Sequence, residues 1–140
     1  MARVNVIIIR AEGNYSAHIE DIKGLVATGT SLNDIKKNVV SMVEGYKTFC
    51  LERQLDIPLN LKGETEYNFK MDVESLLSFY NGLFTKAGLE RITGINQKQL
   101  WHYSSGRVSP RETQVEKMQN AIRKLGEELI SITLCSTSSE

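Results

Sequence analysis

The residues with the clearest chemical capacity lie in one short stretch, GINQKQLWHYSSGRVSPRE at positions 94–112. Within it, Gln97, Lys98 and His102 fall on what we predict to be the outward face of a helix. A glutamine side chain can form two hydrogen bonds with the edge of an adenine, and lysine or histidine can reach guanine acceptors or phosphate oxygens. Because glutamine is neutral, such a helix fits a chain whose formal net charge is +0. We therefore take these three residues as candidates for reading nucleic-acid bases.

Two short helices and a turn must position these side chains. Gly94 is expected to form the turn, because glycine adopts positive φ at no steric cost. The second helix is expected to span 96–104, with Leu100 and Tyr103 directed into the core. Two helices joined in this way make a helix-turn-helix pattern. The alternative is an ordinary helical pair in a small bundle, and for Trp101 taken alone the favoured interpretation is core packing.

Further helices are predicted on both sides of this pair. Helical periodicity begins at Asp72, which is expected to cap a helix that ends near residues 81–82. Thr85 is expected to cap the next helix. The segment SPRE at 109–112 predicts the start of the last helix, with its serine as N-cap, its proline in the first helical position and its glutamate completing a capping box. Residues 129–134 alternate in polarity and predict a strand.

The first half of the chain is predicted to form a sheet with one long helix. Residues 4–10, VNVIIIR, are apolar on both faces, which is typical of a central strand. Glu12-Gly13-Asn14 is a hairpin signal, and Ser31 is expected to cap the long helix. The remaining strands are predicted at 15–19, 25–28 and 65–71. The sequence therefore predicts an α+β fold, with a βββαβ domain over residues 1–71 and an all-α domain with a C-terminal tail over residues 72–140.

Composition and charge favour a soluble cytoplasmic protein. The chain is 41% hydrophobic and 24% charged, as globular proteins are, and no apolar run reaches the length of a membrane span. Cys50 and Cys135 have no CxxC spacing, so we expect two free thiols in a reducing cytoplasm. Residues 72–126 hold eight Lys or Arg and five acids, whereas the tail from residue 127 holds three acids and no base. A local surplus of positive charge permits phosphate binding.

The stretch GLERITGINQKQLWHYSSGRVSPRE, residues 88–112, resembles the DNA-binding helix-turn-helix of the Cro and phage-repressor class. In one respect it departs from that class, because Glu90 stands where a small residue such as alanine is preferred. We expect either an atypical helix crossing or a Glu90 side chain that turns outward. The resemblance implies base reading by Gln97, Lys98 and His102 and phosphate contacts by Lys86, Arg107 and Arg111.

The stretch YSAHIEDIKGLVATGTSLNDIKKNV, residues 15–39, is similar to the HicB family of antitoxins. It has that family's Tyr-Ser-Ala strand, an acidic residue before a glycine, and a long helix, but Glu20 stands where a proline is usual. The resemblance implies a partial ribonuclease H-like fold, a small HicA-type RNA-cleaving toxin as partner, and binding to the protein's own operator as a homodimer or higher oligomer. His18, Glu20 and Asp21 are then candidate toxin contacts, and the alternative for the two acids is a solvated turn.

The sequence does not favour an enzyme. Ribonuclease H-like nucleases hold two metal ions about 4 Å apart between carboxylates, one of them on the central first strand. Residues 3–9 contain no Asp or Glu, and no zinc pattern, P-loop or nucleophile elbow occurs. We expect no catalytic residues, no metal and no cofactor. The leading hypothesis is a toxin-binding, DNA-binding antitoxin, the second a stand-alone transcription regulator with an N-terminal dimerisation or sensing domain, and the third a nucleic-acid-processing enzyme.

Overall fold

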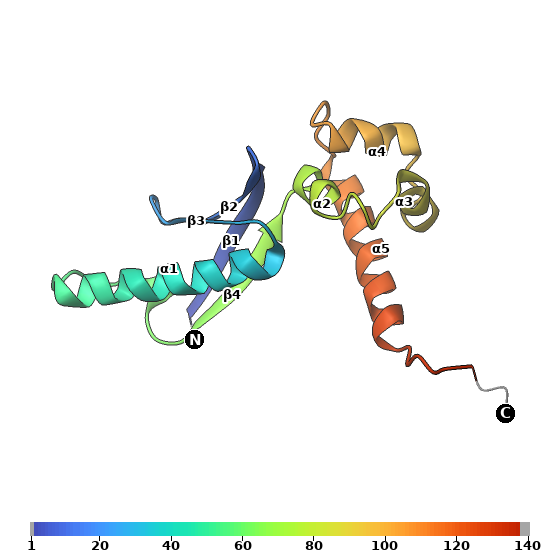
Figure 1. The fold of residues 1–140 in the computed structure, drawn as a ribbon. Helices are drawn as coiled ribbons and strands as arrows, with labels where there is room; N and C mark the ends of the chain where they lie inside the picture. The colour runs from blue at the N-terminus through green and yellow to red at the C-terminus, as the bar shows by residue number, and fades with distance from the viewer. Residues whose placement is uncertain (1, 138–140) are drawn as a thin grey trace. The chain divides into compact units, whose positions relative to one another are not determined.

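The computed structural model describes residues 2–137 and shows a mixed α+β protein (Figure 1). The described elements are four strands, five α-helices and one short 3-10 helix. They form two compact units, one that extends to Phe79 and one that begins at Tyr80. No helix in the described part of the chain is long and apolar enough to cross a membrane.

The N-terminal unit is built on a four-stranded sheet with the order β3-β2-β1-β4. Strand β1 (Ala2–Ala11) pairs antiparallel with β2 (Asn14–Ile19) through a tight hairpin, and parallel with β4 (Thr65–Met71). The short strand β3 (Val26–Gly29) pairs antiparallel with β2. The central position of β1 and the hairpin that joins it to β2 confirm both predictions. Only one face of β1 is fully buried, however, because Val4, Val6 and Ile8 lie in the core whereas Ile9 is 37% exposed.

Helix α1 (Leu32–Glu52) lies across one face of the sheet (Figure 1). Its N-cap is Ser31, whose hydroxyl oxygen accepts a hydrogen bond from the backbone N–H of Asp34 at 3.2 Å, as the sequence predicted. Strand β3 approaches α1 so closely that a Cβ on Gly29 would lie 2.7 Å from Ile35 Cγ1. The largest buried side chains of this core are Val4, Val6, Ile8, Ile19, Ile35, Val39, Val43 and Leu61, the last from the 3-10 helix Leu59–Leu61.

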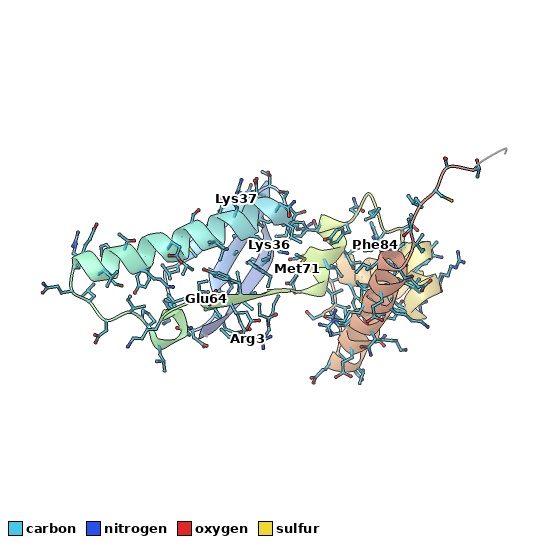
Figure 2. All side chains as sticks on the ribbon, turned by 90° about the horizontal axis from the view of Figure 1, so that it is seen from below. Arg3, Lys36, Lys37, Glu64, Met71 and Phe84 are labelled. Atoms are coloured by element: carbon cyan, nitrogen blue, oxygen red, sulfur yellow. The ribbon has the colours of Figure 1, made fainter. Side chains whose placement is uncertain are left out.

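Side chains of β4 also contact α1 and the core on the face of the sheet that α1 covers. The ammonium group of Lys36 on α1 lies 5.4 Å from the ring centroid of Phe69 on β4. Figure 2 shows Lys36 on the helix and Met71 at the end of β4. Tyr67 and Met71 of β4 also pack against this core, while Glu66 and Lys70 are exposed. The strand predicted at 65–71 is therefore confirmed.

Helix α2 (Val73–Phe79) belongs to the N-terminal unit rather than to the helical one. The hydroxyl oxygen of its buried Ser75 accepts a hydrogen bond from the backbone N–H of Arg10 at 2.9 Å. The rings of Tyr15 and Phe79 stack with their centroids 3.6 Å apart. These contacts with β1 and β2 explain why the boundary between the units follows Phe79, later than the predicted boundary after residue 71.

The helical unit consists of α3 (Lys86–Thr93), α4 (Gln97–Ser104) and α5 (Glu112–Ile130). Its buried residues come from all three helices and from the turn between the first two. They are Leu89, Thr93, Ile95, Leu100, Tyr103 and Met118. The predicted spans of α3 and α4 agree with the structure to within one or two residues.

Two predictions about the last helix are wrong. Helix α5 begins at Glu112 after an extended Arg111, and no side chain caps it, so the SPRE capping box does not form. Residues 129 and 130 continue α5, and the backbone N–H of Ser131 donates to the Glu127 and Glu128 carbonyls, so the predicted strand over 129–134 is absent. A strand needs a neighbour to satisfy its backbone, and the described structure pairs no strand with this segment, whereas the helix satisfies itself.

Candidate nucleic-acid interface

The turn between α3 and α4 is fixed by its own hydrogen bonds. Gly94 has a φ of 78°, and its N–H donates to the Glu90 carbonyl at 2.8 Å. The buried hydroxyl of Thr93 donates to the Leu89 carbonyl at 2.6 Å and accepts from the Ile95 N–H at 3.1 Å. Because these groups satisfy one another and Ile95 is buried, the turn holds α4 in one orientation relative to α3.

Helix α4 presents a polar face and buries the opposite one. Its N-cap is Asn96, whose side-chain oxygen accepts from the Gln99 N–H at 2.8 Å. Leu100 and Tyr103 are buried, as predicted. The exposed side chains on the opposite face are Gln97, Lys98 and Trp101, and His102 beside them is half-buried.

Glu90 turns outward and contacts the first of these residues. The Gln97 Nε2 atom donates a hydrogen bond to Glu90 Oε1 at 3.0 Å. The residue that departs from the phage-repressor pattern therefore orients a predicted base-reading residue. With one amide hydrogen held by Glu90, the Gln97 side-chain oxygen stays available as an acceptor.

Trp101 is an exposed aromatic residue on the same face. Its side chain is 61% exposed, so the interpretation of Trp101 as a packing residue is wrong. The ammonium group of Lys86, at the start of α3, lies 5.7 Å from the centroid of the indole ring. This cation–π contact places a predicted phosphate-contact residue next to the exposed face of α4.

His102 is less accessible than Gln97 and Lys98. Its ring is half-buried, and in the described structure its Nδ1 atom is buried without a hydrogen-bond partner. The His102 carbonyl accepts from the backbone N–H groups of Arg107 and Val108 at 3.1 and 3.4 Å. His102 therefore connects α4 to the following loop in addition to lying beside its exposed face.

The positive charges of the helical unit are not neutralised within it. Arg107 and Arg111 are exposed, and the turn between them and α4 contains Gly106 with a φ of 77°. Both ion pairs among the described residues lie in the N-terminal unit, Arg10 with Glu74 and Lys47 with Glu44. No described Lys or Arg of the helical unit has a carboxylate oxygen within 4.0 Å, so these groups remain free to bind external anions.

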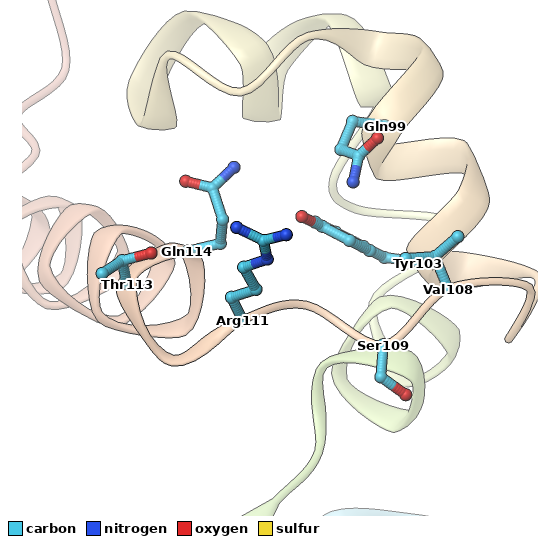
Figure 3. A pocket seen from close by; sticks show the side chains of 7 residues that line it. All are labelled: Gln99, Tyr103, Val108, Ser109, Arg111, Thr113 and Gln114. Carbon is cyan, nitrogen blue, oxygen red and sulfur yellow. The ribbon is translucent and has the colours of Figure 1, made fainter.

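The structure adds a pocket that the sequence did not indicate. It has a volume of about 420 Å³ and lies between α4 and the start of α5. Figure 3 shows the guanidinium group of Arg111, the hydroxyl of Tyr103 and the side-chain amides of Gln99 and Gln114 directed into it. Tyr103 had been assigned only to the core, and the spacing of the two glutamines gives no signal, because folding brings them together from two helices.

A second hollow lies at the other predicted site, in the N-terminal unit. It has a volume of about 390 Å³ and is lined by residues 18–24, which include His18, Glu20 and Asp21. Glu20 Oε1 accepts from Asn5 Nδ2 at 3.0 Å, and Asn5 Oδ1 accepts from Asn68 Nδ2 at 2.9 Å. The structure thus places the three predicted residues around one hollow and ties Glu20 to the sheet, while Asp21 is exposed.

Neither a metal site in the described residues nor a match to a known protein helps to assign the function. Among the described residues, no three His, Cys, Asp or Glu side chains are grouped so that they could hold a metal ion. Comparisons of the chain with protein-family models, with curated proteins and with solved structures find no match. The geometry of the two predicted sites therefore carries the functional argument.

Proposed function

We propose that the protein is a DNA-binding antitoxin of the HicB type, in which α3 and α4 act as a helix-turn-helix. The observation that carries the proposal is the exposed face of α4, where Gln97, Lys98 and Trp101 project from a helix fixed by a buried turn. An α-helix of this kind fits the major groove of B-DNA, and its polar side chains then meet the base edges.

Base reading and phosphate contact are divided between different residues. Gln97 and Lys98 contact the edges of the bases. His102, which lies beside them on α4, is the third base-reading residue. Lys86, Arg107 and Arg111 hold phosphates, because their charges have no internal partner among the described residues. Two copies bind the two halves of a palindromic operator, as the symmetry of such complexes requires.

The N-terminal unit is proposed to bind a small RNA-cleaving toxin of the HicA type through a partial ribonuclease H-like sheet. An RNA-cleaving protein needs a basic surface for its substrate, and the carboxylates of Glu20 and Asp21 complement such a surface. We propose no nuclease activity for this unit, because β1 offers no carboxylate to bridge metal ions.

The DNA-binding proposal is tested with the full chain and fluorescence-labelled duplexes from its own upstream region. We expect tighter binding to the operator than to scrambled DNA, and a loss of about 1–3 kcal/mol with relaxed sequence preference for Gln97→Ala and Lys98→Ala. Gln119→Ala, an exposed substitution on α5, serves as the matched control. Equal affinity of wild-type protein for operator and scrambled DNA contradicts the proposal.

Toxin binding separates this proposal from the alternative, a stand-alone helix-turn-helix transcription regulator with an N-terminal dimerisation or sensing domain. Co-expression with the small protein encoded beside this gene is expected to give a stable complex and to relieve toxicity. Asp21→Asn and Glu20→Gln together are expected to slow association, whereas Gln97→Ala leaves it unchanged. Operator binding without any complex favours the stand-alone regulator.

A further inference from the structure

The pocket between α4 and the start of α5 is lined by hydrogen-bond donors that suit an anion. Tyr103 is only 2% exposed, yet its hydroxyl points into the pocket and has no hydrogen-bond partner in the described structure (Figure 3). The hydroxyl oxygen is not among the buried unpaired atoms of the described residues, so it opens onto the pocket, where water or a ligand can accept its hydrogen bond. The hydroxyl therefore marks a position at which an external acceptor is favoured.

The other polar groups in the pocket are also hydrogen-bond donors. The guanidinium of Arg111 carries five N–H donors and no acceptor, and it forms no ion pair with a described carboxylate. The side-chain amides of Gln99 and Gln114 face the same space from α4 and α5 (Figure 3). No Asp or Glu lines the pocket, so Arg111 supplies the one charged side chain of its lining.

The backbone of α5 adds to this potential. The helix has 19 residues, and its N-cap, Arg111, provides no side-chain hydrogen bond to the first turn. The Gln114 and Val115 N–H groups donate to the Arg111 carbonyl, whereas Thr113, which lines the pocket, lies in the uncapped first turn. The N-terminus of an uncapped helix favours a negative charge beside it.

We infer that this pocket binds one phosphate-class oxyanion, with Arg111 as its charge partner and the hydroxyl of Tyr103, whose ring is held in the core, as a fixed donor. Donors that converge from α4, from the preceding loop and from α5 suit a tetrahedral group with several oxygens. Such an anion can be a backbone phosphate of bound DNA or a free phosphorylated small molecule. The first source rests on the proposed function, and the second does not.

The test uses the full chain labelled with ¹⁵N and inorganic phosphate as the probe. Phosphate is expected to shift the side-chain amide signals of Gln99 and Gln114 and the Arg111 Nε–H signal, while chloride at equal ionic strength does not. Tyr103→Phe, which keeps the buried ring, and Arg111→Gln are each expected to weaken phosphate binding about tenfold. Arg123→Gln, an exposed substitution on the same helix as Gln114, is expected to leave it unchanged.

The outcomes separate the pocket from the proposed function. Shifts caused equally by chloride, or shifts that survive both Tyr103→Phe and Arg111→Gln in folded protein, overturn the inference whatever the DNA result. If Tyr103→Phe unfolds the chain, Gln114→Ala with Gln119→Ala as its control gives the same decision.

In a second titration at saturating duplex DNA, displacement of phosphate assigns the pocket to a backbone phosphate, and simultaneous binding assigns it to a free anion. If phosphate binds but the protein does not prefer its operator over scrambled DNA, the anion site stands and the DNA-binding proposal fails.

Discussion

Gln97 and Glu90 illustrate how a single side-chain contact can set the specificity of an exposed helix. Their hydrogen bond of 3.0 Å fixes which atoms of the Gln97 amide face outward. The same contact keeps a carboxylate close to the surface at which DNA phosphates are proposed to lie. In the proposed DNA complex, Glu90 would therefore oppose affinity and support selectivity, which is how specific sites exclude wrong partners.

Removal of the Glu90 carboxylate tests this opposition. Glu90→Ala is expected to strengthen binding to all DNA sequences and to narrow the difference between operator and scrambled DNA. Because the contact is near the surface, the free energy of unfolding is expected to change by less than about 1 kcal/mol. Fluorescence anisotropy with both duplexes measures the two affinities, and Glu116→Ala on α5 is the exposed control. An unchanged ratio of affinities contradicts the assigned role.

Trp101 and Leu100 are neighbours in sequence with opposite environments. Leu100 is 0% exposed and Trp101 is 61% exposed. Leu100→Ala is expected to lower the free energy of unfolding by about 2–5 kcal/mol, whereas Trp101→Ala is expected to lower it by less than about 1 kcal/mol. Urea denaturation followed by circular dichroism measures both values. A large loss for Trp101→Ala contradicts the exposed position.

The sole tryptophan also reports on the interface directly. If α4 enters the major groove, operator binding is expected to change Trp101 fluorescence and to protect it from quenching by acrylamide. Scrambled DNA at low occupancy provides the reference for this measurement. Binding that is seen by anisotropy but leaves the tryptophan unprotected places the contact elsewhere on the helical unit.

At the scale of elements, the turn between α3 and α4 depends on a glycine conformation. Gly94 has a φ of 78°, which L-residues with a Cβ adopt only at a cost. Gly94→Ala is expected to lower the free energy of unfolding by about 1 kcal/mol. Gly45→Ala, within α1 where an added Cβ meets nothing within 4 Å, is expected to raise it by about 0.5–1 kcal/mol. Thermal denaturation measures both variants. A lower melting temperature for Gly94→Ala and a higher one for Gly45→Ala confirm the prediction, and changes in the same direction contradict it.

Strand β4 carries a buried hydroxyl that links stability to pH. Burial, and then the nearby Glu44 carboxylate, raises the pKa of Tyr67 above its ordinary value of 10.0. Tyr67 therefore ionises first in the unfolded chain as pH rises, so its ionisation leaves the free energy of unfolding unchanged below pH 10.0 and lowers it above that pH. Tyr67→Phe is expected to reduce the fall in the free energy of unfolding above that pH.

The same substitution has an expected effect at neutral pH. In the described structure the Tyr67 hydroxyl oxygen is buried without a hydrogen-bond partner. Its removal is expected to raise the free energy of unfolding by about 1 kcal/mol, since an unsatisfied polar group leaves the core. Urea denaturation at neutral and alkaline pH measures both effects, and a destabilised Tyr67→Phe protein contradicts this description of β4.

At the scale of the whole molecule, a formally neutral chain divides its charge unevenly. Residues 80–140 hold eight Lys or Arg and six acids, whereas residues 1–79 hold nine Lys or Arg and eleven acids. A surplus of base in the helical unit and a surplus of acid in the N-terminal unit suit partners of opposite charge. The two proposed partners differ in this way, because DNA is negatively charged and the proposed toxin is basic.

The salt dependence of DNA binding measures this charge division. Arg107→Gln is expected to weaken binding to all sequences alike and to reduce the slope of log affinity against log salt by about one. Lys117→Gln, an exposed substitution on α5 outside the proposed interface, is the control. A changed base preference in Arg107→Gln contradicts a role limited to phosphate contact.

The sequence by itself determined the local features of this protein. Local sequence predicts Ser31 and Thr85 as N-caps and Gly94 as a turn, and the structure places each of them as expected. These assignments succeed because a cap or a turn is made by hydrogen bonds between residues three or four apart. The βββαβ order and the exposed face of α4 followed from apolar spacing for the same reason.

Only the tertiary structure decided the features that depend on distant partners. The SPRE segment has the composition of a capping box, yet α5 begins two residues later than predicted and Arg111 enters the pocket instead. Residues 129–134 alternate like a strand, but without a neighbouring strand in the described structure the backbone continues as helix to Ile130. Helix α2 joins the sheet through Ser75 and Tyr15, contacts that span more than sixty residues of sequence. Such contacts form between residues remote in the chain, so no local pattern encodes them.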